Sequence, residues 1–276
     1  MVPPWVPDVE SPIAGGGALD AEQQDGIITS PASSAPSAAV IPENPIAPAG
    51  RFGNARRSLG EFGRSGNSGA MRRGVGRYIQ GGYGGRGTAT RRFGGTARTA
   101  DALYSALGGT SGGAGTSSAL PQTAAPQDVV LTNSRSADDV MDAVVEAIRP
   151  VDGTQDGEAS RAAIKDALSE LLTKFPEADL LSLDEAQREF AIERYVAADV
   201  FRRFDLDVGQ SIKDKAPTAK IALARLKEVR DYIKETVSAA FRGLRSAGQK
   251  LAGGKIANIV RSALDETFKV FEGYAE

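Results

Sequence analysis

The chain of 276 residues contains no cysteine and no histidine. Without cysteine it has neither disulfides nor thiolate metal ligands, which is typical of a reducing, cytoplasmic setting. Without histidine it lacks the usual general base near neutral pH, the Ser-His or Cys-His nucleophile and the imidazole metal ligand. Most hydrolase and metalloenzyme designs are therefore excluded, and we expect a protein that is not an enzyme and needs no cofactor.

Long apolar runs are missing as well. No segment approaches the ~20 apolar residues of a membrane span. The start of the sequence, Met1-Val2-Pro3-Pro4-Trp5, lacks the charged and apolar regions of a signal peptide. We therefore expect a soluble cytoplasmic protein that does not contact a membrane.

Lysine is absent from the most unusual segment, Arg51 to Arg98, which holds eleven arginines, fourteen glycines and a single acid, Glu61. Residues 1–50 hold six acids and no base, and residues 101–276 hold 28 acids and 22 bases. A basic island in an acidic chain is typical of a docking surface for phosphate, nucleic acid or an acidic protein face. Arginine favours this because its planar fork binds phosphate or carboxylate through two hydrogen bonds. The partner-binding residues that we predict are Trp5, Arg51, Arg56, Arg57, Arg64, Arg72, Arg73, Arg77, Arg86, Arg91 and Arg92.

Large apolar residues are scarce in residues 1–50, which carry nine of the fourteen prolines. This composition predicts an acidic tail that is extended or disordered when alone. Trp5 has two interpretations of equal weight. It either folds back onto its own domain, or it is the anchor of a proline-stiffened peptide that enters a partner's groove.

Residues 51–108 show apolar positions at helical spacing, opened by three arginine pairs. Glycine inside a helix costs up to about 1 kcal/mol, so the first two of these short helices are expected to need a partner surface. The third, Thr88 to Leu107, has the better signals, with Thr88 as a cap and Gly108 at its end. We therefore expect residues 51–108 to form a partner-binding arm.

Residues 109–135 have the Gly, Ser, Thr and Ala composition of a flexible linker. Residues 136–276 show five amphipathic stripes with helix starts at Ser136, at about Glu158, at Ser182 to Glu185, at Thr218 and at about Lys255. No alternating strand pattern occurs. The expected fold is all-α, with a five-helix, bundle-like domain of about 140 residues behind the arm.

Two site-like motifs have simpler explanations. The stretch Gly82 to Gly87 matches the dinucleotide-binding glycine pattern as letters, but no β-α-β unit surrounds it. The acids Asp199, Asp205 and Asp207 surround an arginine pair and are more typical of a solvated helix end than of a metal site. We therefore expect no metal here.

A nucleic-acid-binding module is the alternative function. In that interpretation the arginines contact phosphate, while aromatic side chains of the same segment stack on bases. The stacking residues would be Phe52, Tyr78, Tyr83 and Phe93.

The order of segments resembles the QatB family of the bacterial Qat anti-phage defence system. The resemblance rests on the Val2-Pro3-Pro4-Trp5 start, the proline-rich acidic tail, the run Arg51 to Arg57 leading to Phe62 to Gly66, the glycine-arginine stretch and the helical domain. It covers most of the chain and is strongest from Pro3 to about Gly108. It implies three partners, namely a QueC-like (QatC-type) enzyme of the deazaguanine type, an ATPase and a TatD-like nuclease, and it implies no catalytic residue.

Members of this family look to begin with Met-Gly-Thr-Ser and a glycine-serine run before the Val-Pro-x-Trp element, whereas this sequence starts at Met1-Val2-Pro3. An N-terminal glycine in that head is where the QueC-like partner would attach its product. Either the start is trimmed here, or that modification does not occur on this form. The function expected from the sequence is a scaffold or modified-substrate protein that binds the QueC-like enzyme through its N-terminal arm.

Overall fold

Capping signals in the sequence account for the starts of several helices in the second half of the chain. In the computed structural model, α5 (Ala137–Ile148) begins with a capping box in which Ser136 accepts from the Asp139 N–H and Asp139 accepts from the Ser136 N–H. The long helix α9 (Ala219–Ser246) begins at Thr218, whose hydroxyl accepts from the N–H of Ile221. For α7 (Glu185–Phe204), the expected capping residue was wrong by two positions, because Asp184 rather than Ser182 makes the capping box, with Gln187.

The structure describes residues 50–108, 136–251 and 254–276, which belong to one contact unit of residues 47–276. The described residues form helices and no strand, which confirms the all-α class. Trp5 and the predicted linker 109–135 lie outside the described residues. The remaining helices are α1 (Gly53–Ser65), α2 (Ser68–Arg77), α3 (Arg86–Arg92), α4 (Gly94–Ala106), α6 (Gln155–Lys174), α8 (Gln210–Lys215) and α10 (Ile256–Glu272), with π-helical turns η1 (Tyr78–Gly82) and η2 (Asp205–Gly209).

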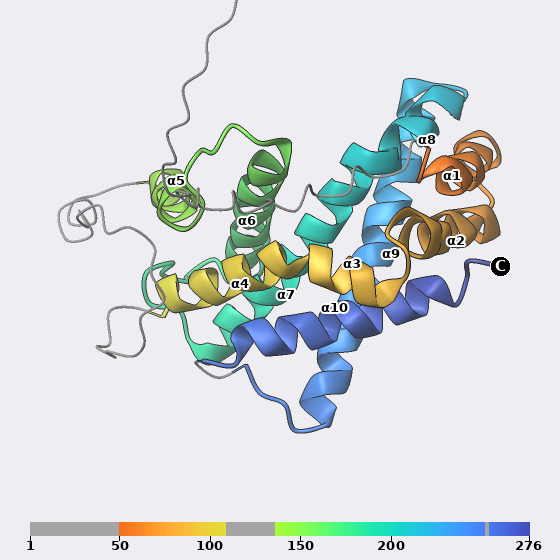
Figure 1. Ribbon diagram of the computed structural model, residues 1–276. Helices are drawn as coiled ribbons and strands as arrows, with labels where there is room; N and C mark the ends of the chain where they lie inside the picture. The colour runs from red at the N-terminus through yellow and green to blue at the C-terminus, as the bar shows by residue number, and fades with distance from the viewer. Residues whose placement is uncertain (1–49, 109–135, 252–253) are drawn as a thin grey trace, which may run out of the picture. The chain divides into compact units, whose positions relative to one another are not determined.

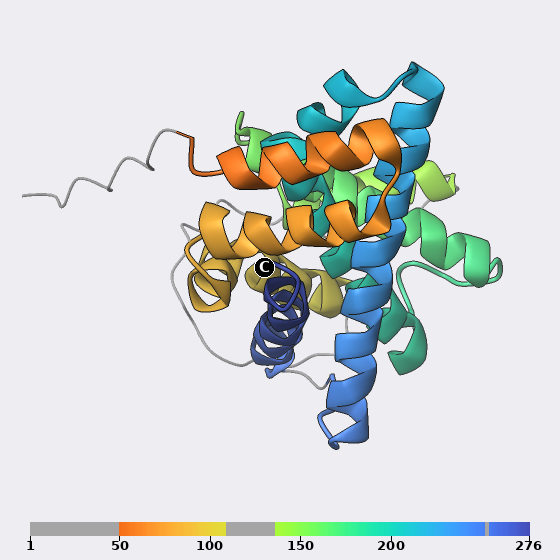
Figure 2. The same cartoon turned by 90° about the vertical axis from the view of Figure 1, so that its right-hand side faces the viewer.

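The helices of the basic segment pack among those of the second half of the chain. Helices α1 and α2 lie side by side, with α8 against α1, while α3 and α4 run along α10 (Figure 1). The long α9 passes beside this group, as the view turned by 90° shows (Figure 2). Helix α7 contacts α4, α6 and α9, so it connects the two halves of the described structure.

Glycine makes this close packing possible. A Cβ atom on Gly63 would lie 2.7 Å from the backbone oxygen of Ile212 in α8. A Cβ atom on Gly76 would lie 2.6 Å from the backbone oxygen of Phe271 in α10. Because real Cβ atoms essentially never come so close to backbone atoms, these crossings exclude any side chain. The glycines that weaken the isolated helices are therefore the residues that let them dock on their neighbours.

The shared core changes the interpretation of residues 51–108. Phe62, Ile79, Phe93 and Leu103 are fully buried in the same apolar cluster as Phe204 and Phe268. The composition of the sequence predicts an arm in residues 51–108 and a folded unit in residues 136–276. In the structure the short helices of the arm are held by the tertiary packing that was expected only from a partner.

The predicted helix from Thr88 to Leu107 is divided in two at Phe93. The ring of Phe93 is buried between the rings of Tyr83 and Phe268, whose centroids lie 5.7 and 5.1 Å from its own. The hydroxyl of Thr88 makes no cap, because α3 already begins at Arg86 after the left-handed Gly84 and Gly85. The division turns α4 onto α10 and leaves Arg91 and Arg92 at the end of α3.

Candidate functional site

A polar hollow of about 200 Å³ lies where the basic segment meets α6, α7 and η2. We call it the arginine pocket. Its lining residues are Arg51, Tyr83, Arg92, Asp156, Arg203, Leu206 and Asp207.

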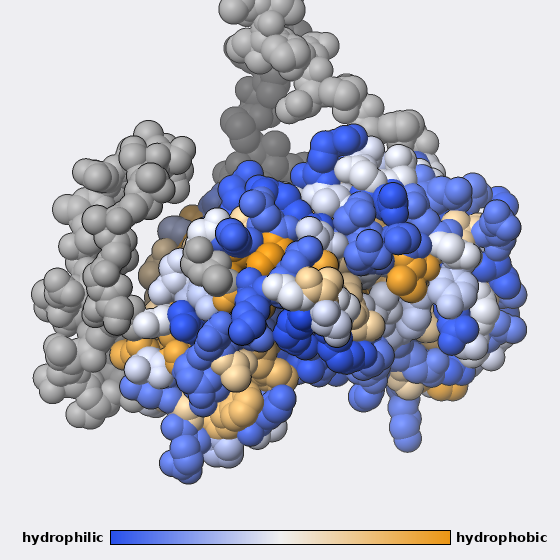
Figure 3. All heavy atoms as spheres, turned by 90° about the horizontal axis from the view of Figure 1, so that it is seen from below, coloured by the Kyte–Doolittle hydropathy of each residue, from blue (hydrophilic) through white to orange (hydrophobic). Residues whose placement is uncertain are grey.

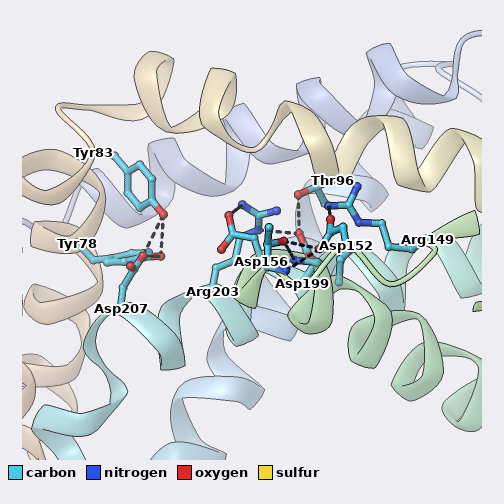
Figure 4. A network of polar contacts seen from close by, with 12 residues as sticks. Tyr78, Tyr83, Thr96, Arg149, Asp152, Asp156, Asp199, Arg203 and Asp207 are labelled. Carbon is cyan, nitrogen blue, oxygen red and sulfur yellow. Dashed lines mark hydrogen bonds and ion pairs between the residues drawn. The ribbon is translucent and has the colours of Figure 1, made fainter. Parts of the chain in front are cut away.

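Two π-helical turns build one wall of the arginine pocket. Tyr78, in η1, and Tyr83, which follows it, donate their hydroxyls to Oδ2 of Asp207 in η2 at 2.9 and 3.0 Å (Figure 4). Burial, together with the nearby Asp207, raises the pKa of both tyrosines, so both remain donors at neutral pH. π-Helical turns interrupt an α-helix and often occur at functional sites, and here they place the two tyrosines and the carboxylate face to face.

Arg203 lines the arginine pocket and is held by two carboxylates. Its Nη1 donates to Asp156 of α6 at 3.1 Å, and its Nε donates to Asp199 of α7 at 3.2 Å (Figure 4). Asp199 is fully buried and also accepts the Thr96 hydroxyl at 2.5 Å. Burial raises the pKa of the Asp199 carboxyl, while Arg203 and Thr96 lower it part of the way back. Arg203 is thereby held in one place by two acids from different helices.

Arg51 and Arg92 are the other cations of the arginine pocket. The guanidinium of Arg51 lies over the ring of Phe52 at 4.4 Å and within 5.8 Å of the ring of Tyr83. Such cation–π contacts hold the Arg51 guanidinium in place. Neither Arg51 nor Arg92 forms an ion pair with an acid in the part of the chain that the structure describes.

The groups that line the arginine pocket are hydrogen-bond donors and acceptors suited to binding a polar ligand. Among residues 50–108, 136–251 and 254–276, no group of three or more acids is placed to hold a metal ion. Asp199, Asp205 and Asp207 do not converge, because they are bound to Arg203, Lys213 and the two tyrosines. The arrangement offers arginine N–H donors, two tyrosine rings and the exposed side chain of Leu206.

The structure brings some of the predicted partner-binding residues together and separates others. Arg51 and Arg92 meet in the arginine pocket, and Arg56 lies nearby, where it donates to the backbone oxygen of Asp207 at 2.9 Å. Arg77 is used internally, since it bonds the Ser58 hydroxyl and the Ala275 carbonyl. The rest lie on the surfaces of three helices, with Arg57 and Arg64 on α1, Arg72 and Arg73 on α2, and Arg86 and Arg91 on α3.

The aromatic residues of the nucleic-acid hypothesis are not free to stack on bases. Phe52, Tyr78 and Phe93 are at most 4% exposed, and only Tyr83 is partly accessible. Their rings pack on one another, as in the stacked pair Phe52 and Tyr78 at 5.4 Å. This part of the hypothesis was wrong, because helical spacing does not distinguish a contact residue from a core residue.

The acidic half of the site was not predicted: Asp207 was interpreted as part of a solvated helix end, and Asp156 was not singled out. Asp156, Asp207 and Arg203 come from segments that no local motif connects to residues 51–98. The acidic first turn of α6 and the arginine pair at the end of α7 are both ordinary helix-end signals. The packing of α6 on α7 brings Asp156 to Arg203, and the hydrogen bonds from Tyr78 and Tyr83 bring Asp207 to the basic segment.

Fold and site define an all-α protein with an arginine-lined pocket. None of the described helices is long and apolar enough to cross a bilayer. A family model, described as Qat anti-phage system associated protein QatB, matches residues 84–271. The chain belongs to this family, and is therefore a component of an anti-phage defence system. No curated protein and no solved structure matches it.

The family match confirms the resemblance and shifts its centre. The resemblance was expected to be strongest from Pro3 to about Gly108, whereas the matched residues begin at 84 and run to 271. The arginine pocket therefore has Arg92 and its acidic half inside the matched region, and Arg51 outside it.

Proposed function

We propose that this chain is a non-catalytic, partner-binding component of the defence complex and that it binds a QueC-like enzyme of the deazaguanine type. In this proposal the binding region consists of the N-terminal segment with Trp5 and the exposed arginines of residues 51–98. The ATPase and the TatD-like nuclease of the same system are further candidate partners, and the protein is cytoplasmic.

One observation carries the proposal, namely the scarcity of ion pairs among the eleven arginines of residues 51–98. Within the described residues, only Arg73 and Arg86 approach an acid, at 3.6 and 3.9 Å. The arginines of the second half are paired much more closely, as in Arg161 with Glu146 at 2.8 Å and Arg202 with Asp166 at 2.6 Å. The charge of the basic segment is thus left available for another molecule, which steers association toward an acidic face.

Helix α1 offers the clearest surface of this kind. Arg57 and Arg64 are exposed and seven residues apart, so they lie on the same face two turns from each other. Arg51 joins this helix to the N-terminal segment that carries Trp5. Five large apolar side chains are exposed among the described residues, two of them, Val270 and Tyr274, one turn apart. The face seen from below is mostly hydrophilic, with apolar patches between the polar side chains (Figure 3). A charged contact supported by one aromatic anchor fits such a surface.

Co-purification of the full chain with the QueC-like enzyme tests the proposal. The double variant Arg57→Glu and Arg64→Glu should lose the complex, whereas Arg230→Glu, an exposed position on α9, should retain it. Trp5→Ala should weaken the complex by ~2 kcal/mol if Trp5 is a buried anchor. Arg57→Lys should also weaken it, since a point cation does not replace a two-pronged donor. A complex that tolerates all of these changes would place the interface elsewhere.

Nucleic acid remains the alternative, favoured by the same unpaired arginines but without the stacking residues. Binding would then depend on phosphate alone, and log affinity would fall with log salt by about 0.9 for each phosphate neutralised on a duplex. Fluorescence anisotropy with duplex and single-stranded oligonucleotides measures this slope. Failure to bind either at low salt would remove the alternative.

A further inference from the structure

We propose that the arginine pocket binds a small molecule through its phosphate group, a function separate from partner docking. Arg51, Arg92 and Arg203 come from three distant parts of the chain and line one hollow. Two acids, Asp156 and Asp207, also line the hollow, so its lining carries one net positive charge, which attracts an anion. The convergence therefore favours an anionic ligand.

The two acids that line the arginine pocket do not bind the N–H donors of Arg51 and Arg92. Asp156 accepts from Arg203, and Asp207 is occupied by the two tyrosine hydroxyls. Within the described residues, neither acid forms an ion pair with Arg51 or Arg92. Both of these guanidinium groups keep their N–H donors for a ligand. Asp156 belongs to the first turn of α6, so the positive end of that helix also adjoins the hollow.

A phosphate group fits these donors better than a carboxylate does. A carboxylate has two acceptor oxygens, whereas a phosphate monoester has three, and paired arginine forks satisfy them in bidentate geometry. The volume of about 200 Å³ leaves room beyond one phosphate for an organic group. Leu206, which is 52% exposed, and the ring of Tyr83 supply apolar surface for that part.

The test is a titration of the full chain with inorganic phosphate and, separately, with AMP, at ionic strength held constant with chloride. Calorimetry should show saturable binding with a Kd of about 1 mM or tighter. Arg51→Gln and Arg92→Gln should each weaken it by about tenfold or more, because each removes charge-assisted hydrogen bonds. Arg98→Gln, an exposed arginine of α4 that does not line the pocket, is the matched control and should bind normally. Arg203 is left intact, since it also holds the buried Asp199.

Circular dichroism and urea unfolding establish that each variant is folded before its affinity is compared. Equal affinity for phosphate and AMP would mean that only the phosphate is recognised, and tighter binding of AMP would assign a role to the apolar wall. Both results support the pocket. Absence of saturable binding up to about 10 mM would overturn it, as would an equal loss in Arg98→Gln, which would indicate a general charge effect. Arg51→Gln and Arg92→Gln should still co-purify with the QueC-like enzyme, because Arg57 and Arg64 are intact in both variants; loss of the complex with phosphate binding unchanged would assign these two arginines to partner docking and overturn the pocket.

Discussion

Replacing Gly76 by alanine tests whether the basic segment is part of the core. The added Cβ would lie 2.6 Å from the carbonyl oxygen of Phe271 in α10 and 2.7 Å from the backbone nitrogen of Ala275, which follows that helix. Alanine gains about 0.8–1 kcal/mol of helix propensity. Overpacking against backbone costs about 1–3 kcal/mol, and two contacts this short place the cost at the upper end. We expect a net loss of about 1–2 kcal/mol in the free energy of unfolding.

The same substitution at Gly243 is the matched control. This glycine lies inside α9, is exposed, and has no atom within 4 Å of the added Cβ. Only the propensity gain applies there, so Gly243→Ala should stabilise by up to about 1 kcal/mol. Urea unfolding followed by circular dichroism gives both values, and the loss in Gly76→Ala should lower Tm by roughly 2–8 °C. If Gly76→Ala is as stable as Gly243→Ala, α2 does not pack on α10 and the shared core is refuted.

Three further predictions concern the core and its buried polar groups. Proteolytic cleavage within residues 109–135 should leave the two fragments associated on a sizing column, because α4 and α10 share one core; fragments that separate would restore an independent domain of residues 136–276. Tyr78→Phe should lower the free energy of unfolding in urea by about 1.5–3 kcal/mol, because it removes a hydrogen bond to the Asp207 carboxylate. Tyr274→Phe, at an exposed position, should cost almost nothing. Equal losses in the two variants would contradict the hydrogen bond between Tyr78 and Asp207. Burial raises the folded-state pKa of Asp199 above its ordinary 3.8, so its contribution to stability is present at low pH and is lost as pH rises through the folded-state pKa. The free energy of unfolding of the wild type relative to Asp199→Asn should therefore fall as pH rises above 3.8. A difference that stays constant with pH would show that the pKa is not shifted.

The all-α class and the starts of α5 and α9 follow from the sequence alone. Ser136 with Asp139, and Thr218 before α9, act within three or four residues, so the local chemistry is sufficient to place these helix starts. The absence of cysteine and histidine likewise limits the chemistry of any fold that the chain adopts. Family membership was also visible in the order of its segments.

Only the tertiary structure decided what the arginine-glycine segment does. In isolation Gly63 and Gly76 weaken their helices, and that local cost predicted an arm that orders on a partner. At the crossings with α8 and α10 the same glycines allow backbone contact that any larger residue would prevent. The arginine pocket follows the same rule, because Arg51, Arg92 and Arg203 meet only after these crossings form. Local signals depend on neighbours along the chain, whereas a core and a pocket depend on which helix faces meet, and that is a long-range property.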